Sequence, residues 1–415
     1  MQSYKICGGK MLSGKIKVEG SKNALLPIIA ASILVKDIVE LENVTPLEDT
    51  YAMIDILRLL NVRVIYDHKS KMIIDSRNLV NKRISSEYTS KLRASYYFMG
   101  ALLALYKSVK VGKPGGCDFS TRPIDLHLFA FENLGFDVVE EKNFYKFKKE
   151  REPKQIIEFS KVSVGATVNA ILASVLNKGT TILKNVAMEP EIDDLINFLN
   201  KCGSKIKRED NKIIVEGVYN LFGCKYKIMD DRIEAETYVV IGALLGRNLE
   251  IICDCKKYMK EFLLLMNKVG VHVKETSSGL IVNAAKEIKE QSLIFNVYPG
   301  LPTDIQPVLT ILFTKSKGES VFEDNVYPDR FSQVDELVSM GYNLHLADKK
   351  LLIRRNNAYL DSVVSCKDLR GGMSLIVAAI LSNKTTCIKN CEYISRGYYD
   401  VINKLKRVGA HIEKI

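Results

Sequence analysis

Six stretches of small and apolar residues, each long enough to form a helix, recur at nearly even intervals along the chain. They span residues 24–34, 92–105, 166–176, 233–245, 305–313 and 369–381. None of them carries the wide polar face of a surface helix, and a helix that is apolar all round is buried. The pattern therefore predicts six central helices with strand-rich segments packed outside them.

A second pattern closes each unit: a helical stretch, one small or polar residue, and then a β-rich hydrophobic run. It occurs at Leu60-Asn61-Val62, Leu134-Gly135-Phe136, Cys202-Gly203-Ser204, Val269-Gly270-Val271, Met340-Gly341-Tyr342 and Val408-Gly409-Ala410. The central residues are 74, 68, 67, 71 and 68 positions apart. Six units of about 69 residues account for the chain, each read as helix, strand, helix and strand. The predicted fold class is α/β, with six repeats in one body or in two bodies of three, and residues 207–225 as a boundary segment.

Composition narrows the class of protein. The 415 residues are 47% hydrophobic and 26% charged, which is typical of a folded globular chain and excludes a disordered one. The net charge of +11 indicates an anionic partner: nucleic acid, an acidic membrane or a phosphorylated small molecule. The longest uncharged apolar run, residues 23–35, is too short to cross a bilayer. Without a signal-peptide pattern at the start, a cytoplasmic location is expected.

Nine scattered cysteines do not indicate a disulfide framework, and Cys202 and Cys366 are expected in the core. The five histidines are isolated in the sequence and form no Ser-His-Asp or Cys-His arrangement. We find no Gly-rich phosphate loop of the P-loop or dinucleotide-binding type either.

The residues at the heads of the six predicted helices are more informative. They are Lys22, Arg93, Lys161, Arg232, Asp304 and Arg370, spaced by 71, 68, 71, 72 and 66 positions. A cation at a helix N-terminus is disfavoured by roughly 0.3–1 kcal/mol, so five basic residues at equivalent places are not explained by helix stability. Solvated surface residues remain an alternative for any single position. For five positions together, we favour a convergent site for an anion such as phosphate.

Asp304 is the exception among the six heads. An Asp at this place is a good helix cap. An acid among cations also stays ionised and could accept a proton from a substrate hydroxyl. The residues alone leave these two roles equally open.

A glycine-rich segment, residues 113–123, carries an exposed cysteine, Cys117. The nearby Lys113 and Arg122 favour a reactive thiolate, whereas Asp118 opposes it. A mobile loop with a reactive group is typical of an active-site lid. We therefore favour a functional Cys117 over an ordinary exposed thiol.

These residues match a known family along essentially the whole chain. The matching motifs are Gly20-Ser21-Lys22-Asn23-Ala24, Pro114-Gly115-Gly116-Cys117, Arg122-Pro123-Ile124-Asp125-Leu126-His127, Val164-Gly165-Ala166-Thr167, Glu189-Pro190-Glu191-Ile192, Pro302-Thr303-Asp304, Asp368-Leu369-Arg370 and Arg396-Gly397-Tyr398. The chain resembles the UDP-N-acetylglucosamine 1-carboxyvinyltransferases, which are enolpyruvyl transferases related to EPSP synthase. The resemblance implies a two-lobed inside-out α/β barrel, with one lobe at residues 20–227 and the other at 1–19 plus 228–415.

The resemblance also implies the reaction. The enolpyruvyl group of phosphoenolpyruvate is transferred to the 3-hydroxyl of UDP-N-acetylglucosamine through a tetrahedral intermediate, and phosphate is released. This is the first step of peptidoglycan precursor synthesis. No cofactor or metal is implied, because Lys and Arg offset the substrate charges. The expected partners are the two small-molecule substrates, without nucleic acid or membrane, and a monomer is favoured. Two alternatives remain: a transferase for 3-phosphoshikimate, and a non-catalytic or regulatory paralogue that binds nucleotide sugars.

Site residues follow from the resemblance, position by position. The implied catalytic residues are Cys117 as general acid, Asp304 as base, Lys22 and Arg396. Phosphoenolpyruvate is expected to contact Lys22, Asn23, Cys117, Arg122, Arg330, Arg370 and Arg396. UDP-N-acetylglucosamine is expected to contact Asn23, Arg93, Arg122, Pro123, Ile124, Asp125, Leu126, Lys161, Val162, Ser163, Val164, Gly165, Asp304 and Val326. Alkylation of Cys117 by epoxide antibiotics that mimic phosphoenolpyruvate is expected too.

The chain departs from the family's usual residues at several places. Glu236 replaces a Gly beside a predicted helix head, and Met188 replaces an Arg. Residues 118–121 are larger and more charged than usual, and Tyr327-Pro328-Asp329 replaces Phe-Glu-Asn. These departures concern turnover rate, lid motion and strict substrate choice more than the class of reaction.

Overall fold

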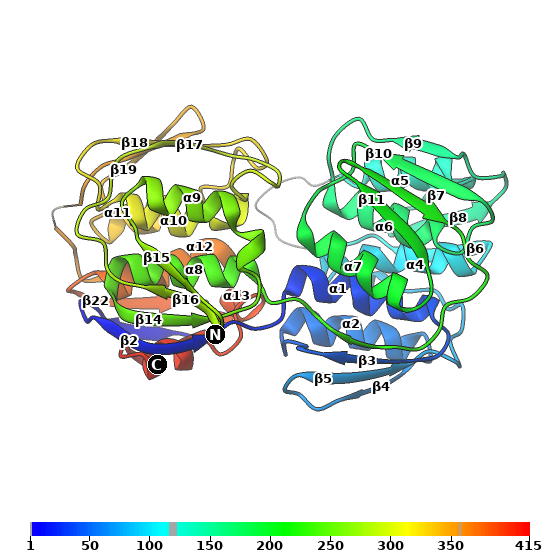
Figure 1. The fold of residues 1–415 in the computed structure, drawn as a ribbon, viewed down its shortest axis with the longest axis horizontal. Helices are drawn as coiled ribbons and strands as arrows, with labels where there is room; N and C mark the ends of the chain where they lie inside the picture. Colours follow the sequence, from blue (N-terminus) through cyan, green and yellow to red (C-terminus); the bar gives the residue numbers. More distant parts are fainter. Residues whose placement is uncertain (1, 116–122, 357) are drawn as a thin grey trace. The chain divides into compact units, whose positions relative to one another are not determined.

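The computed structural model describes residues 2–115, 123–356 and 358–415. The chain divides into two compact units (Figure 1). One, here called the continuous unit, is Gly20–Met229. The other, the discontinuous unit, joins the residues up to Glu19 with Asp230–Ile415. Each unit has its own hydrophobic core.

The continuous unit contains three repeats with the same order of elements: central helix, strand, outer helix and a two-stranded hairpin. The first is α1 (Lys22–Ala31), β3 (Ile38–Glu42), α2 (Glu48–Leu59), β4 (Arg63–Tyr66) and β5 (Lys71–Asp75). The second is α4 (Tyr97–Leu105), β6 (Ser108–Gly112), α5 (Asp125–Asn133), β7 (Phe136–Glu140) and β8 (Phe144–Lys149). The third is α6 (Val164–Ser174), β10 (Thr180–Lys184), α7 (Pro190–Lys201), β11 (Lys205–Glu209) and β12 (Lys212–Glu216).

The discontinuous unit repeats this order three more times. The fourth repeat is α8 (Arg232–Leu245), β14 (Gly246–Ile252), α9 (Lys260–Lys268), β15 (Val273–Thr276) and β16 (Gly279–Val282). The fifth is α10 (Gln306–Phe313), β18 (Ser320–Asp324), α11 (Val334–Ser339), β19 (Leu344–Ala347) and β20 (Lys350–Ile353). The sixth is α12 (Leu369–Leu381), β22 (Thr385–Lys389), α14 (Val401–Arg407) and β23 (His411–Lys414), completed by β1 (Tyr4–Cys7).

Short elements connect these repeats or form sheet edges. The helical ones are η1 (Ser32–Leu34), α3 (Ser86–Thr89), η2 (Arg93–Tyr96), η3 (Lys256–Tyr258), η4 (Thr303–Ile305) and α13 (Glu392–Ser395). The edge strands are β2 (Leu12–Lys17), β9 (Ile156–Glu158), β13 (Lys225–Lys227), β17 (Ser292–Phe295) and β21 (Ser362–Ser365).

The strands of each repeat form a separate sheet, so the described part of the chain contains six sheets. Five of them share one order: a parallel edge strand, then antiparallel neighbours, as in β9-β10-β12-β11 with Ile182 opposite Ile156. In the second repeat a parallel bridge between Ile84 and Val111 takes the place of the edge strand. β1 and β2 complete the sixth and fourth sheets, which ties the N-terminal segment to the discontinuous unit. The predicted α/β class with six repeats is confirmed.

The central helices are buried, as their composition predicted. Every residue of α8 is buried, and in α12 all residues after Leu369 are buried. α8, α10 and α12 pack on one another, and α4 packs on α1 and α6. Burying side chains on all faces of a helix requires neighbours on all sides, which sheets outside and helices inside provide. In the discontinuous unit, Asp304 before α10 and Arg370 at the start of α12 are thereby brought into contact.

Two details differ from the sequence prediction. The first central helix ends at Ala31 and continues as the 3-10 turn η1. Residues 207–225, expected as a boundary segment, lie inside the continuous unit, which ends at Met229; they contain β12 and lead into β13, which pairs with β3 in parallel. In the described ranges, no helix is both long enough and apolar enough to span a lipid bilayer.

Candidate functional site

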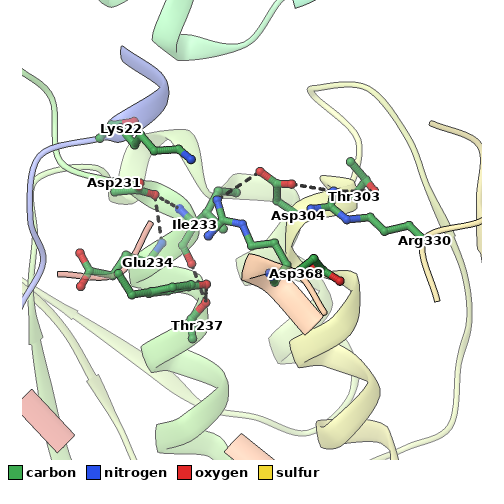
Figure 2. Close-up of polar contacts among 12 residues, drawn as sticks. Lys22, Asp231, Ile233, Glu234, Thr237, Thr303, Asp304, Arg330 and Asp368 are labelled. Atoms are coloured by element: carbon green, nitrogen blue, oxygen red, sulfur yellow. Dashed lines mark hydrogen bonds and ion pairs between the residues drawn. The ribbon is translucent and has the colours of Figure 1, made fainter. Parts of the chain in front are cut away.

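A cluster of charged side chains lies where α8, α10 and α12 begin in the discontinuous unit (Figure 2). Asp304, in η4 just before α10, is held by two arginines. Its Oδ1 atom is 2.7 Å from Nη1 of Arg330, and its Oδ2 atom accepts a hydrogen bond from Nη2 of Arg370 at 3.2 Å. Nη1 of Arg330 also donates to the hydroxyl of Thr303 at 3.2 Å. Arg330 and Arg370 are buried, whereas the Asp304 side chain is 26% exposed.

Asp304 is not a helix cap, so that alternative from the sequence is wrong. No side chain caps η4 or α10, and the Asp304 carboxylate faces guanidinium groups instead. In α8 and α12 of the discontinuous unit, the caps are acids one or two residues before the basic heads. Asp231 accepts from two backbone N–H groups of α8, and Asp368 accepts from two of α12. The negative charge that a helix N-terminus favours is therefore supplied by these caps.

The guanidinium of Arg370 lies inside the protein, 5.3 Å from the ring centroid of Tyr398. Burial alone would lower the pKa of Arg370, but Tyr398, Asp304 and Asp231 raise it, so the group stays charged. The Tyr398 hydroxyl lies 2.8 Å from the hydroxyl of Thr237 in α8. Tyr398 thus connects α8 with α12, and it lies two residues after the predicted site residue Arg396.

In the continuous unit, Lys22 is the first residue of α1, which Ser21 caps through a bond from the N–H of Ala24. Its Nζ atom lies 3.0 Å from Oδ2 of Asp49, the second residue of α2. Sequence reasoning missed Asp49, although two acids at the start of α2 are a recognisable signal. Asn23 follows Lys22 and is exposed. The ammonium group of Lys22 is therefore positioned by an acid from the next helix of the same repeat.

A second cluster of the continuous unit contains Arg93, the first residue of η2. Its guanidinium lies 5.8 Å from the ring centroid of Tyr96, and that ring packs edge-on against His127 at 4.6 Å. Asn169 of α6 reaches the His127 Nδ1 atom at 2.8 Å. Burial is the main cause that lowers the pKa of His127 to about 3, and the positive charge of Arg93 adds to it. His127, which forms no catalytic motif in the sequence, therefore contacts Tyr96 and Asn169 in the fold.

The start of α6 lies against this cluster. Ser163 caps α6 through the N–H of Ala166 at 3.3 Å. A Cβ atom at Gly165 would lie 2.8 Å from both the His127 Cε1 atom and the Tyr96 hydroxyl, so only glycine fits. Lys161 is exposed and lies two residues before the cap, outside the helix whose head it was expected to form.

The other predicted site residues are distributed over both units, and Cys117 and Arg122 lie outside the described residues. In the continuous unit, Ile124 is buried at the start of α5, Pro123 and Asp125 are exposed, and the partly buried residues are Leu126, Val162 and Val164. In the discontinuous unit, Arg396 is half-buried at the end of α13, and the N–H of Val326 donates to Asp324 at 2.9 Å. Glu236, expected near a helix head, is 1% exposed inside α8.

Comparisons with known proteins agree with this architecture. The sequence model of the family "EPSP synthase (3-phosphoshikimate 1-carboxyvinyltransferase)" matches residues 6–405. The chain is 37% identical over 415 residues to UDP-N-acetylglucosamine 1-carboxyvinyltransferase 2 of Bacillus subtilis (strain 168), which covers 99% of this chain and 96% of that one. The enzyme of the same name from Listeria innocua is 37% identical over 410 residues, covering 99% and 97%.

Solved structures give the same fold. The enolpyruvyl transferase NikO from Streptomyces tendae superposes with a TM-score of 0.92 at 20% identity, covering 100% of this chain and 99% of that one. An EPSP synthase from Acinetobacter baumannii gives a TM-score of 0.77 at 17% identity, covering 100% of both chains. Because the family match spans nearly the whole length and the fold agrees, this chain belongs to the EPSP synthase family of carboxyvinyltransferases.

Proposed function

We propose that this chain transfers the enolpyruvyl group of phosphoenolpyruvate to the 3-hydroxyl of UDP-N-acetylglucosamine and releases phosphate. The observation that carries the proposal is the 37% identity, along 99% of the chain, to relatives named for this reaction. The likeness to EPSP synthase structures at 17% identity supports the shared fold alone. The acceptor is therefore the nucleotide sugar rather than 3-phosphoshikimate.

The negative charges of the two substrates match the positive charges of the Lys and Arg side chains in both units. Phosphoenolpyruvate and a nucleoside diphosphate together carry about five negative charges near pH 7. Buried arginines offer planar pairs of N–H donors that match carboxylate and phosphate oxygens. We assign Arg330, Arg370 and Arg396 of the discontinuous unit, with Lys22, Asn23, Cys117 and Arg122 of the continuous unit, to phosphoenolpyruvate. No metal is needed for charge neutralisation in this scheme.

The proposed chemistry has two steps. In the first, the sugar oxygen bonds to C2 of phosphoenolpyruvate, Cys117 gives a proton to C3, and Asp304 takes the hydroxyl proton. In the second, the C2–O bond to phosphate breaks, C3 returns a proton to the Cys117 thiolate, Asp304 gives its proton to the departing phosphate, and the enol ether and phosphate leave. Addition and elimination together return both protein groups to their starting states.

Two guanidinium groups hold the Asp304 carboxylate, and their positive charges stabilise its ionised form. The carboxylate and phosphate of phosphoenolpyruvate compete for the same two arginines. We propose that this competition frees Asp304 to accept the proton only when phosphoenolpyruvate is bound.

The nucleotide sugar is assigned to the heads of α1, η2, α5 and α6 in the continuous unit and to two residues of the discontinuous unit. The residues proposed are Asn23, Arg93, Arg122, Pro123, Ile124, Asp125, Leu126, Lys161, Val162, Ser163, Val164, Gly165, Asp304 and Val326. Supporting this, the start of α6 combines a helix N-terminus with a capping serine, and Arg93 lies nearby on the Tyr96 ring. We expect the protein to be a monomer. We expect it to work in the cytoplasm, because such highly charged substrates do not cross a lipid bilayer unaided.

The test measures phosphate release from phosphoenolpyruvate with either UDP-N-acetylglucosamine or 3-phosphoshikimate as acceptor. We expect release only with the nucleotide sugar, and its loss in Cys117→Ala. The matched control is Cys7→Ala, because Cys7 lies in β1 and belongs to no proposed site. Phosphate release with 3-phosphoshikimate but not with UDP-N-acetylglucosamine would overturn the proposed choice of acceptor. Tight binding of the nucleotide sugar by calorimetry without any release would instead favour a non-catalytic paralogue.

An independent test uses a small epoxide that mimics phosphoenolpyruvate. With UDP-N-acetylglucosamine present, intact mass spectra should show one covalent adduct on the native chain and none on Cys117→Ala. An adduct that persists in Cys117→Ala and maps to another cysteine would contradict the assigned role of Cys117.

A further inference from the structure

Two thiols that the proposed reaction does not use lie in contact inside the continuous unit. The Sγ atoms of Cys202 and Cys224 are 3.2 Å apart. Cys202 ends α7, and Cys224 immediately precedes β13. A disulfide has a sulfur–sulfur length of about 2.0 Å, so an approach of about 1 Å completes the bond. Such an approach is within reach of side-chain rotation, provided that the backbone already places the two residues correctly.

The backbone on both sides is fixed by hydrogen bonds. The N–H of Cys202 donates to the carbonyl of Phe198 at 3.1 Å, and its own carbonyl accepts from the N–H of Phe222 at 2.8 Å. The carbonyl of Cys224 accepts from the N–H of Glu40, next to the parallel pairing of β13 with β3. The thiols therefore meet because two hydrogen-bonded segments place them together, and not because a loose loop carries one of them.

Access distinguishes this pair from the other neighbouring cysteines in the described part of the chain. Cys202 is fully buried, whereas Cys224 is partly exposed. Both members of the other two pairs are buried, namely Cys253 with Cys255 and Cys366 with Cys391. A small oxidant can therefore reach one sulfur of the first pair while the second waits behind it.

The electrostatics assign the roles of the two sulfurs. The hydrogen bond with the Cys202 thiol and, as a smaller contribution, the positive charge of Lys201 lower the pKa of Cys224. The same thiol contact, together with burial, raises the pKa of Cys202. The more exposed sulfur is thus the better nucleophile, because the thiolate is the reactive form.

We propose that Cys202 and Cys224 form a redox modification site that hydrogen peroxide converts reversibly into a disulfide. The Cys224 thiolate attacks one peroxide oxygen, the O–O bond breaks, and a sulfenic acid forms while the other oxygen leaves as water after protonation. The Cys202 sulfur then attacks the sulfenic sulfur, the S–O bond breaks, and a second water leaves. The two sulfurs lose two electrons, and the peroxide gains them. A thiol reductant reverses the change.

The disulfide would tie the end of α7 to the segment entering β13, and β13 ends two residues before the continuous unit ends at Met229. Closing the loop of residues 202–224 restricts the unfolded chain and so stabilises the folded unit. We expect oxidation to raise the thermal midpoint of the native chain and to slow hydrogen exchange in residues 217–227. The site goes beyond the proposed function, and its readouts do not depend on activity.

The experiment oxidises the reduced full-length chain with hydrogen peroxide, alkylates remaining thiols after denaturation, and maps cysteines by mass spectrometry. We expect one peptide pair joined through Cys202 and Cys224, lacking two hydrogen atoms and separated again by dithiothreitol. The other two buried pairs serve as internal controls and should be fully alkylated. Full alkylation of both Cys202 and Cys224 at peroxide levels that oxidise Cys117 would overturn the proposal.

Two variants complete the test. Cys224→Ser should prevent any sulfenic acid at this site, and Cys202→Ala should leave a sulfenic acid at Cys224 that a dimedone probe captures. Both variants should keep phosphate release, because neither residue belongs to the proposed machinery. Capture at Cys202 in the Cys224→Ser chain would reverse the assigned roles and contradict the mechanism. Since the native chain alone tests the cross-link, a variant that folds poorly does not obscure the result.

Discussion

The Nζ atom of Lys22 lies 3.0 Å from an Oδ atom of Asp49, and the two side chains are only 15% and 5% exposed. The pair joins the first turn of a central helix to the first turn of the outer helix in the same repeat. A lysine side chain has many rotamers, and fixing it costs up to about 2 kcal/mol of entropy. Asp49 supplies that restraint before any substrate arrives.

We therefore expect Asp49→Asn to lower kcat/KM for phosphoenolpyruvate by about tenfold or more, since the ammonium group loses its orienting charge. KM for phosphoenolpyruvate should rise, and KM for the nucleotide sugar should change little. The control is Asp55→Asn, because Asp55 is half-exposed on the same helix and lies 3.9 Å from Arg58. Steady-state kinetics for both substrates measure this, and equal rates for the two variants would exclude a positioning role for Asp49.

Asp304 allows a sharper separation of binding from chemistry. Asp304→Asn removes the proposed base but leaves Arg330 and Arg370 available to substrate anions. We expect kcat to fall by about 10²–10⁴, as for removal of a general base, with KM for phosphoenolpyruvate unchanged or lower. Asp329→Asn is the control, because Asp329 is exposed and lies next to Arg330 in the chain. A rise in KM with normal kcat would assign Asp304 to binding alone.

The architecture could be read from the sequence because its cause is local. Helices that are apolar on every face must be buried, and α8 shows this along its whole length. Strand runs that follow at fixed intervals then become one sheet for each helix. The number and positions of the six repeats could be predicted from the even intervals between the apolar helical stretches, and the folded chain keeps these intervals.

The site partners could not be read in the same way, because they depend on where each helix begins and on distant neighbours. Lys161 stands at the expected interval, yet Ser163 caps α6 and leaves Lys161 outside the helix. Asn169 lies 42 residues from His127, in another repeat, and no local pattern connects the two. Helix boundaries shift by one or two residues without changing the hydrophobic pattern, and this is enough to exchange a head residue for a cap.

A buried ion network in the discontinuous unit gives a prediction on stability. Lys404 Nζ lies 2.8 Å from Glu234 and 3.0 Å from Glu19, and the hydroxyl of Tyr238 donates to Glu234 at 2.9 Å. Lys404→Met would leave a carboxylate buried without its cation. Breaking a buried pair in this way costs about 3–5 kcal/mol.

Urea denaturation of Lys404→Met should show this loss, and the exposed Lys406→Met should unfold like the native chain. The double variant Lys404→Met with Glu234→Gln should recover part of the loss, since the buried charge is removed with its partner. A double variant no more stable than Lys404→Met would mean that the lost packing of the lysine stem dominates.

His127 gives a prediction on pH. Asn169 accepts a hydrogen bond from the N–H of Gly100 through its Oδ1 atom at 3.0 Å, so its amide nitrogen faces His127 and donates to Nδ1. The imidazole is then neutral, with its proton on Nε2. The folded-state pKa is about 3 against 6.5 unfolded. Between these values the unfolded chain binds more protons, so stability is complete above pH 6.5 and falls as the pH drops.

The expected slope is about 1.4 kcal/mol per pH unit, or about 2 kcal/mol between pH 6.5 and pH 5. Asp194 acts in the opposite sense, because burial raises its pKa from 3.8 to about 6, and stability therefore rises on acidification in that interval. A curve of stability against pH for the native chain alone contains the contributions of both His127 and Asp194. The difference between the native chain and His127→Gln, followed by urea denaturation from pH 7 to pH 5, cancels the Asp194 contribution. That difference should shrink by about 2 kcal/mol on acidification, whereas His68→Gln, at an exposed position, should show no such change. A constant difference for His127→Gln would mean that the folded chain binds the proton as readily as the unfolded one.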